Sequence, residues 1–231
     1  MSETGPTLAE IATERLRRDI IHGALKPAEK LQLRGLKARY GLGGSPIREA
    51  LSRLESEGLV TSESQRGFWV APTSAEDLRD IIRLRQVIEG AALRHSIEHG
   101  DEAWEIALVT AFHRLQKIAK QLVERPPGWE ESWEARHRAF HMALLAGCES
   151  PRMTEQCAKL YAETQRYRRL FLGYEFVAEE IVEEHRRLMQ VAVDRDADKA
   201  VLDHAAHLAL TLDLDAALQL SPSNARGRNV A

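Results

Sequence analysis

Four histidines in the second half of the chain have the residue type and the spacing of a metal site. His137 and His141 are four residues apart in SWEARHRAFHMALL, so on a helix their imidazoles project from one face. His185 and His207 follow in two later segments of helical periodicity. If these two helices run antiparallel, all four rings can approach one level of a bundle. Inward imidazoles suit Zn²⁺, Ni²⁺ or another first-row divalent ion, so we predict a metal centre here.

The same cluster leaves an enzymatic interpretation open, because a metal held by histidines can activate water for hydrolysis. The general base beside the cluster would be Glu134, which lies three residues before His137 on the same helical face. A metal-dependent hydrolase is therefore the alternative function. The remaining histidines are interpreted as surface or ordinary core residues: His22, His95, His99, His113 and His204.

Long amphipathic helices must position these histidines. From about residue 76 onward Leu, Ala, Arg and Glu dominate, a composition that favours helices over sheets. The apolar spacing, with Ser74 as the first N-cap, predicts six helices at about 74–99, 101–124, 129–146, 151–172, 175–193 and 196–218. Six helices with short connections form an antiparallel bundle.

The first 72 residues have a different pattern. We expect helices over 8–22 and 33–40, and a third that runs from an N-cap at Ser45, with Pro46 as its first residue, to Gly58. Two β-prone runs, LVT and FWV, flank a polar turn that contains glycine, which predicts a hairpin. Two helices joined by a short turn and followed by a hairpin make a winged helix-turn-helix domain.

Basic residues are concentrated in this first domain, although the net charge of the chain is −3. From Arg15 to Arg53 there are ten Lys or Arg against three acidic residues, a balance of +7, so the rest of the chain carries −10. Arg48, near the start of the third helix, is placed to bridge the O6 and N7 atoms of guanine in a major groove. Arg34 and Ser45 suit contacts to phosphates or base edges.

Arg66 and Gly67, at the tip of the predicted hairpin, suit the minor groove or the DNA backbone. The composition also excludes several classes of protein. With 44% hydrophobic and 29% charged residues the chain can bury a core, and no apolar stretch approaches a transmembrane length. We therefore expect a cytoplasmic protein without a membrane partner. Cys148 and Cys157 are expected to be small buried hydrophobes.

The N-terminal motifs resemble those of a known family. The run LRGLKARYGLGGSPIREALSRLESEGLV, followed by RGFWV, resembles the DNA-binding domain of the GntR family of bacterial transcription regulators over nearly all of residues 8–72. The resemblance implies DNA-contacting roles for Arg34, Gly44, Ser45, Arg48 and Gly67. Gly44 stands where many members have a base-reading arginine or polar side chain.

Residues 76–218 resemble the FCD ligand-binding domain of the FadR-type branch of that family. In that domain an Asp-x-x-x-His pair and two later histidines hold a divalent metal under a small carboxylate effector. His141, His185 and His207 match through the motifs AFHMAL, EEHRRLM and DHAAHL. His137 stands at the position of the aspartate, which makes the ligand set softer and less anionic.

The resemblance also implies where the effector binds. Arg85 and Glu89 match an R-x-x-x-E pattern, in which Arg85 could hold a carboxylate with two hydrogen bonds, or could form an ordinary i,i+4 ion pair with Glu89. Arg166 or Tyr167 could line the same pocket. The segments GDEAWE and HRAFHMALLAGC resemble members that repress glutarate catabolic genes, which implies a C4–C6 dicarboxylate such as glutarate.

These observations predict a mainly α protein. A winged helix-turn-helix domain is expected over 1–72, an FCD-type helical effector-binding and dimerisation domain over 73–220, and a disordered tail over 221–231. The predicted function is a metabolite-responsive repressor, not an enzyme, that binds double-stranded operator DNA as a homodimer. A constitutive DNA-binding protein with an inert dimerising bundle is a third interpretation.

Overall fold

The structure is a computed structural model that describes residues 5–63, 66–121, 124–171 and 179–211. It divides into two compact units, one of Met1–Ser74 with Gln165–Phe171 and the other of Ala75–Thr164 with Leu172–Ala231. Each unit has its own cluster of buried apolar side chains and is described by itself. The tail predicted over 221–231 lies outside the described residues.

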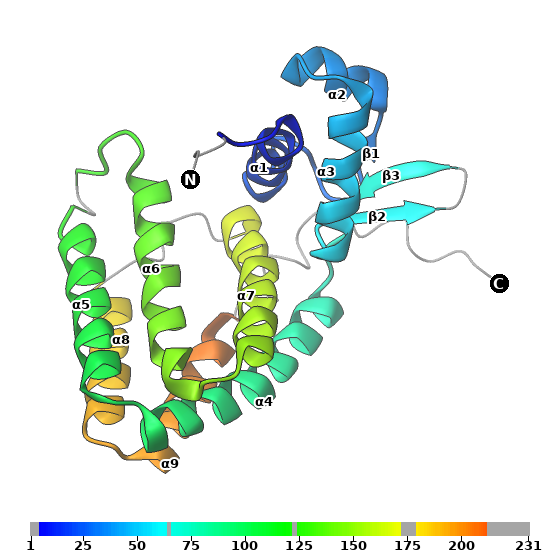
Figure 1. The fold of residues 1–231 in the computed structure, drawn as a ribbon. Coiled ribbons are helices and arrows are strands. Elements are labelled where there is room, and N and C mark those ends of the chain that lie inside the picture. Colours follow the sequence, from blue (N-terminus) through cyan, green and yellow to red (C-terminus); the bar gives the residue numbers. More distant parts are fainter. Residues whose placement is uncertain (1–4, 64–65, 122–123, 172–178, 212–231) are drawn as a thin grey trace. The chain divides into compact units, whose positions relative to one another are not determined.

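The first unit contains the winged helix-turn-helix that the sequence predicts (Figure 1). Its elements are α1 (Leu8–Ile21), β1 (Lys30–Leu31), α2 (Leu33–Tyr40), α3 (Gly44–Ser56), β2 (Val60–Glu63) and β3 (Gly67–Val70). α1 begins with a capping box, in which Thr7 and Glu10 exchange hydrogen bonds. The apolar faces of α1 and α3 meet in the core, where Leu16, Ile47 and Leu51 are fully buried.

Two features of this unit differ from the sequence prediction. Lys30–Leu31 form a third strand that pairs antiparallel with β3, so the strand order is β1-β3-β2. A strand of two residues has no periodicity that a sequence can reveal. The N-cap of α3 is Gly43, not Ser45, because Gly43 takes the extended conformation that a cap needs, with ψ at 166°. Ser45 therefore lies in the first turn of α3, with its side chain exposed.

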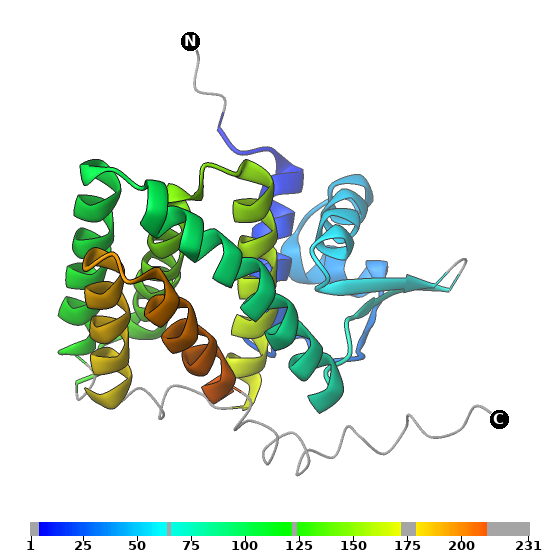
Figure 2. The ribbon, with the colours of Figure 1, turned by 90° about the horizontal axis from the view of Figure 1, so that it is seen from below.

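The second unit is a helical bundle (Figures 1 and 2). Its helices are α4 (Ala75–His99), α5 (Glu102–Ala119), α6 (Trp129–Leu145), α7 (Pro151–Phe171, up to Thr164 in this unit), α8 (Glu179–Val193) and α9 (Ala197–Ala209), with a 3-10 turn, η1, at Ala146–Cys148. α4 and α9 lie side by side, and a Cβ on Gly90 would be 3.4 Å from Val201. The mainly α fold class is confirmed.

Three helix ends differ from the prediction or go beyond the described residues. α5 ends at Ala119 rather than at 124, because its last turn tightens: the N–H of Gln121 bonds to the carbonyl of Ile118, only three residues back. The indole of Trp129 donates to the same carbonyl. The predicted start of α8 at 175 and the predicted end of α9 at 218 fall outside the described residues.

Aromatic side chains fill the bundle beside the predicted metal ligands. The ring of Trp129 stacks on that of Trp133, which in turn stacks on His137 with 5.6 Å between centroids. Cys148 and Cys157 are buried and unbonded to each other, as small hydrophobes are. Within the described residues, no helix is long and apolar enough to cross a membrane.

Candidate metal centre and nucleic-acid interface

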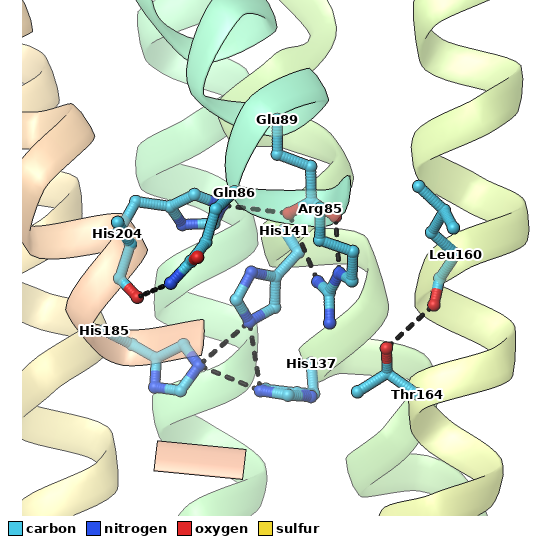
Figure 3. Close-up of polar contacts among 10 residues, drawn as sticks. Arg85, Gln86, Glu89, His137, His141, Leu160, Thr164, His185 and His204 are labelled. Atoms are coloured by element: carbon cyan, nitrogen blue, oxygen red, sulfur yellow. Dashed lines mark hydrogen bonds and ion pairs between the residues drawn. The ribbon is translucent and has the colours of Figure 1, made fainter. Parts of the chain in front are cut away.

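The structure brings the four predicted histidines together inside the second unit. His137 and His141 come from α6, His185 from α8 and His207 from α9; Figure 3 shows the first three. The Nε2 atom of His137 lies 2.9 Å from that of His185 and 3.2 Å from that of His141, and the last two are 3.3 Å apart. One nitrogen from each of the four lies within 4.8 Å of the others.

The hydrogen bonds on the outer side of the His185 and His207 rings fit a bound metal ion. His185 Nδ1 lies 2.6 Å from the carbonyl of Ile181, and His207 Nδ1 lies 3.2 Å from the carboxylate of Glu184. Both partners accept hydrogen bonds, so each ring keeps its proton on Nδ1 and directs the lone pair of Nε2 to the centre. Metal-bound histidines are oriented in this way, so the cluster could hold a metal ion.

Burial favours the neutral form of two of these imidazoles, those of His141 and His207, and the neutral form is the one that binds metal. Desolvation, followed by the neighbouring rings of His137, His185 and His207, lowers the pKa of His141 well below its ordinary value of 6.5. Burial also lowers the pKa of His207, although the carboxylate of Glu184 partly opposes this change. Metal binding at neutral pH therefore need not displace a proton from His141 or His207.

A buried ion pair lies near the cluster. Arg85 donates to both carboxylate oxygens of Glu89, at 2.6 and 3.2 Å, and neither side chain is more than 1% exposed. His204 on α9 completes the group, with its Nε2 2.9 Å from Glu89. The ordinary i,i+4 pair is thus formed, but in the interior. In Figure 3 the third guanidinium nitrogen of Arg85 makes neither bond and points towards His137.

From the sequence alone, His204 is expected to be an ordinary surface or core histidine. Its spacing of three residues from His207 puts both on one face of α9, and this was the available signal. The ring of His204 lies 6.0 Å from that of His141, and its buried Nδ1 has no hydrogen-bond partner among the described residues. His204 therefore joins the ion pair to the histidine cluster.

We expect the Glu89 carboxylate to stabilise the fold above about pH 4.5 and to lose this effect as the pH falls towards 2. Burial alone would raise its pKa, but the charge of Arg85 and the hydrogen bond from His204 lower it from 4.5 to about 2. A depressed pKa in the folded state stabilises the charged form, and the stability is lost on protonation. The difference corresponds to about 3 kcal/mol.

Urea unfolding of the wild type and of a Glu89→Gln variant at several pH values measures this effect. The stability difference should be largest above about pH 4.5 and should shrink at lower pH, because only the wild type loses its carboxylate charge. A difference that stays constant over this range would contradict the assignment.

The structure places the other two predicted effector residues in the first unit. The guanidinium of Arg166 donates to the carbonyl of Ala71, and the hydroxyl of Tyr167 accepts from the N–H of Ser74 at 3.1 Å. Both side chains are buried. These contacts hold the segment that follows β3.

The predicted DNA-contacting residues lie at the surface of the first unit. Arg48 and Ser45 are exposed in the first turns of α3, and Arg34 is exposed in the first turn of α2. A Cβ on Gly44 would be 3.8 Å from Leu33, so the starts of α2 and α3 adjoin. The structure thus brings the predicted DNA-contacting residues of α2 and α3 to one region of the surface.

The hairpin contributes Arg66 and Gly67. Gly67 begins β3 with φ at +114°, a backbone conformation that residues with a Cβ atom rarely adopt. Arg66 is exposed and forms a 3.2 Å ion pair with Glu63, which is also exposed. Because an exposed ion pair contributes little stability, Arg66 can exchange Glu63 for a DNA phosphate at a small cost in free energy.

The basic residues of the first unit differ in whether they form ion pairs within the protein or remain available to a ligand. Several cations of the basic segment are paired within the unit: Arg17 with Glu57 at 2.7 Å, Arg39 with Asp19 at 2.7 Å and Arg53 with Glu49 at 2.6 Å. Within the part of the chain that the structure describes, Arg34 and Arg48 form no ion pair. Unpaired, exposed cations at the starts of adjacent helices fit the charge of a DNA backbone.

Comparison with known proteins decides the family. Residues 8–70 match the family described as bacterial regulatory proteins, gntR family, and residues 80–210 match the FCD domain. The chain belongs to the GntR family. The predicted winged helix-turn-helix and FCD identities are thereby confirmed, and such regulators bind operator DNA and commonly act as dimers with small-molecule effectors.

Relatives and solved structures agree with this assignment. The GntR-family chain is 38% identical over 193 residues to the HTH-type transcriptional regulator BphR of Paraburkholderia xenovorans, covering 84% of this chain and 79% of that protein. It is 34% identical over 189 residues to the HTH-type transcriptional repressor GlaR of Escherichia coli, covering 80% and 85%. The E. coli McbR/YncC structure shares the fold, with a TM-score of 0.72, 21% identity and coverage of 91% and 98%.

The hydrolase alternative is wrong for this GntR-family protein, because its domains and relatives are those of transcription regulators. The position of Glu134 agrees with this correction. Its carboxylate lies 3.5 Å from the hydroxyl of Tyr161, which in turn contacts the outer nitrogen of His137. Glu134 therefore lies behind a candidate ligand, on the side away from the other histidines.

Proposed function

We propose that this GntR-family regulator is a repressor whose operator binding changes when a small dicarboxylate, such as glutarate, binds at the four-histidine centre. The observation that carries this proposal is the cluster of four convergent imidazoles, three buried and one half-buried, with the guanidinium of Arg85 turned towards it. The printed name of the GlaR relative supports the repressor role.

Operator binding rests on the exposed start of α3. Arg48 would contact base edges in the major groove, Arg34 and Ser45 would contact phosphates or bases, and Gly44 would allow close approach of the backbone. Arg66 and Gly67 would contact the backbone or minor groove from the hairpin. A homodimer would present two such surfaces to two half-sites.

The four histidines would hold Zn²⁺ or Ni²⁺, since both ions accept imidazole ligands. The bound ion would supply positive charge that attracts a carboxylate. Arg85 would bind the same ligand through the nitrogen that Glu89 does not occupy. Arg166 and Tyr167, which the sequence suggests as further effector contacts, belong to the first unit.

Thermal unfolding of the full chain with C4–C6 dicarboxylates, with Zn²⁺ or with a chelator, tests this function. We expect glutarate to raise the melting temperature of the Zn²⁺-loaded protein, because a ligand at about 100 times its Kd stabilises by about 2.7 kcal/mol. Monocarboxylates of the same length should act more weakly, since they lack the second anionic group.

Two variants sharpen this test. Arg85→Met should abolish the glutarate effect, whereas Arg83→Met, which alters an exposed arginine on the same helix, should retain it. If no dicarboxylate raises the melting temperature in any metal state, the effector proposal fails. Operator release by glutarate in a gel shift would then connect binding to repression.

A further inference from the structure

The outer nitrogen of His137 has a different kind of partner from those of His185 and His207. Its Nδ1 lies 2.7 Å from the hydroxyl of Tyr161 on α7, and that hydroxyl lies 3.5 Å from the carboxylate of Glu134. His137 and Glu134 are separated by one turn of α6. All three side chains are buried, with at most 6% exposed. They form a chain from a carboxylate through a phenol to an imidazole.

The direction of these hydrogen bonds follows from the chemistry of the three groups. A carboxylate can only accept, so the hydroxyl of Tyr161 donates to Glu134. The phenol oxygen then accepts from Nδ1 of His137, which places the proton of the ring on Nδ1. The lone pair of His137 is thereby left on Nε2, the atom that faces His141 and His185 at 3.2 and 2.9 Å.

We propose that Tyr161 and Glu134 are positioning residues that fix His137 as a metal ligand. They would also supply, from two hydrogen bonds away, the negative charge that an aspartate at position 137 would bring to the ion directly. This inference rests on the proposed metal centre. It assigns functions to two residues, Tyr161 and Glu134, that belong to neither the ligand set nor the effector contacts.

The packing around His137 and Tyr161 holds their two rings in one geometry. His137 is fixed on its other side by stacking on Trp133, with an interplanar angle of 13°. The ring of Tyr161 is also fixed, because the guanidinium of Arg85 lies 5.5 Å from its centroid. Tyr161 therefore contacts both the candidate ligand and the arginine proposed to bind the effector. Its position connects the metal centre to the effector contact.

A set of four imidazole ligands, with the carboxylate held away from the ion, has a consequence for metal choice. Imidazole suits Zn²⁺ and Ni²⁺, whereas Mn²⁺ and Mg²⁺ prefer carboxylate oxygen. With Glu134 held away from the ion, the centre should discriminate against these oxygen-preferring ions. A His137→Asp variant should bind Mn²⁺ more tightly than the wild type, relative to Zn²⁺.

The test is the affinity of the full chain for Zn²⁺ alone, measured by competition with a chromogenic chelator. We expect Tyr161→Phe to weaken Zn²⁺ binding about 10–100-fold, the usual effect of removing an outer partner of a ligand. Glu134→Gln should weaken it less, because an amide can still accept from Tyr161 but has no charge. If both variants bind Zn²⁺ as the wild type does, the proposal is wrong.

Thr164→Val is the matched control. It removes another buried hydroxyl from α7, one that donates to the carbonyl of Leu160, and should leave Zn²⁺ affinity unchanged. Equal losses in the Tyr161 and Thr164 variants would show a general packing effect and overturn the inference. If Tyr161→Phe fails to fold, Glu134→Gln still decides the question.

A double-mutant cycle with His137→Asp shows whether Tyr161 acts through His137. In that background Tyr161→Phe should have little effect on Zn²⁺ affinity, because the imidazole that it orients is gone. The same loss in both backgrounds would overturn the proposal. Failure of the wild type to bind Zn²⁺ would instead remove the metal centre itself, a result distinct from failure of the positioning role.

Discussion

A His185→Ala variant should bind Zn²⁺ at least about 100-fold more weakly than the wild type, since removing merely an outer partner of a ligand already costs about 10–100-fold. His185 is fully buried, and its Nε2 lies 2.9 and 3.3 Å from those of His137 and His141. Chelator competition measures the loss.

The variant should also lose the stabilisation that Zn²⁺ gives the wild type, which at about 1,000 times the Kd amounts to about 4 kcal/mol. His204→Ala is the control, because His204 is equally buried but bonds to Glu89 instead of facing the centre. It should lower stability while changing Zn²⁺ affinity only slightly. Equal Zn²⁺ affinities in the wild type and the His185 variant would exclude His185 from the ligand set.

The second large effect concerns DNA. Arg48→Ala should weaken binding to the regulator's own upstream region by about 10–100-fold, because one bidentate arginine contact to guanine is worth about 1–3 kcal/mol. Arg48 is exposed near the start of α3 and, within the described residues, is not engaged in an ion pair. Its guanidinium is therefore available without the loss of an internal contact.

Arg53→Ala provides a comparison on the same helix, since Arg53 is exposed but bonds to Glu49 at 2.6 Å. Its removal should change affinity by a few fold at most. Gel shifts at several salt concentrations measure both variants and show whether the lost contact is to a base or to a phosphate, because only loss of a phosphate contact lowers the salt slope. Unaltered binding by Arg48→Ala would remove Arg48 from the recognition surface.

Local pattern was sufficient for most elements and for grouping the four histidines. The apolar spacing located α2 at its observed bounds of Leu33–Tyr40, and the i,i+4 spacing of His137 and His141 put both on one face of α6. The bundle architecture then brought His185 and His207 to the same place. These features depend on periodicity and on short connections, which a sequence carries directly.

Contacts between distant residues were decided only by the tertiary structure. The spacing of Arg85 and Glu89 was equally compatible with an exposed ion pair and with an effector contact. The tertiary structure buries the pair and adds His204, 115 residues beyond Glu89, as a third member of the group. The hydroxyl of Tyr161 reaches His137 across 24 residues. No local periodicity encodes such pairs. They form when helices pack through their apolar faces, because the few polar groups buried between the helices must then form hydrogen bonds with one another.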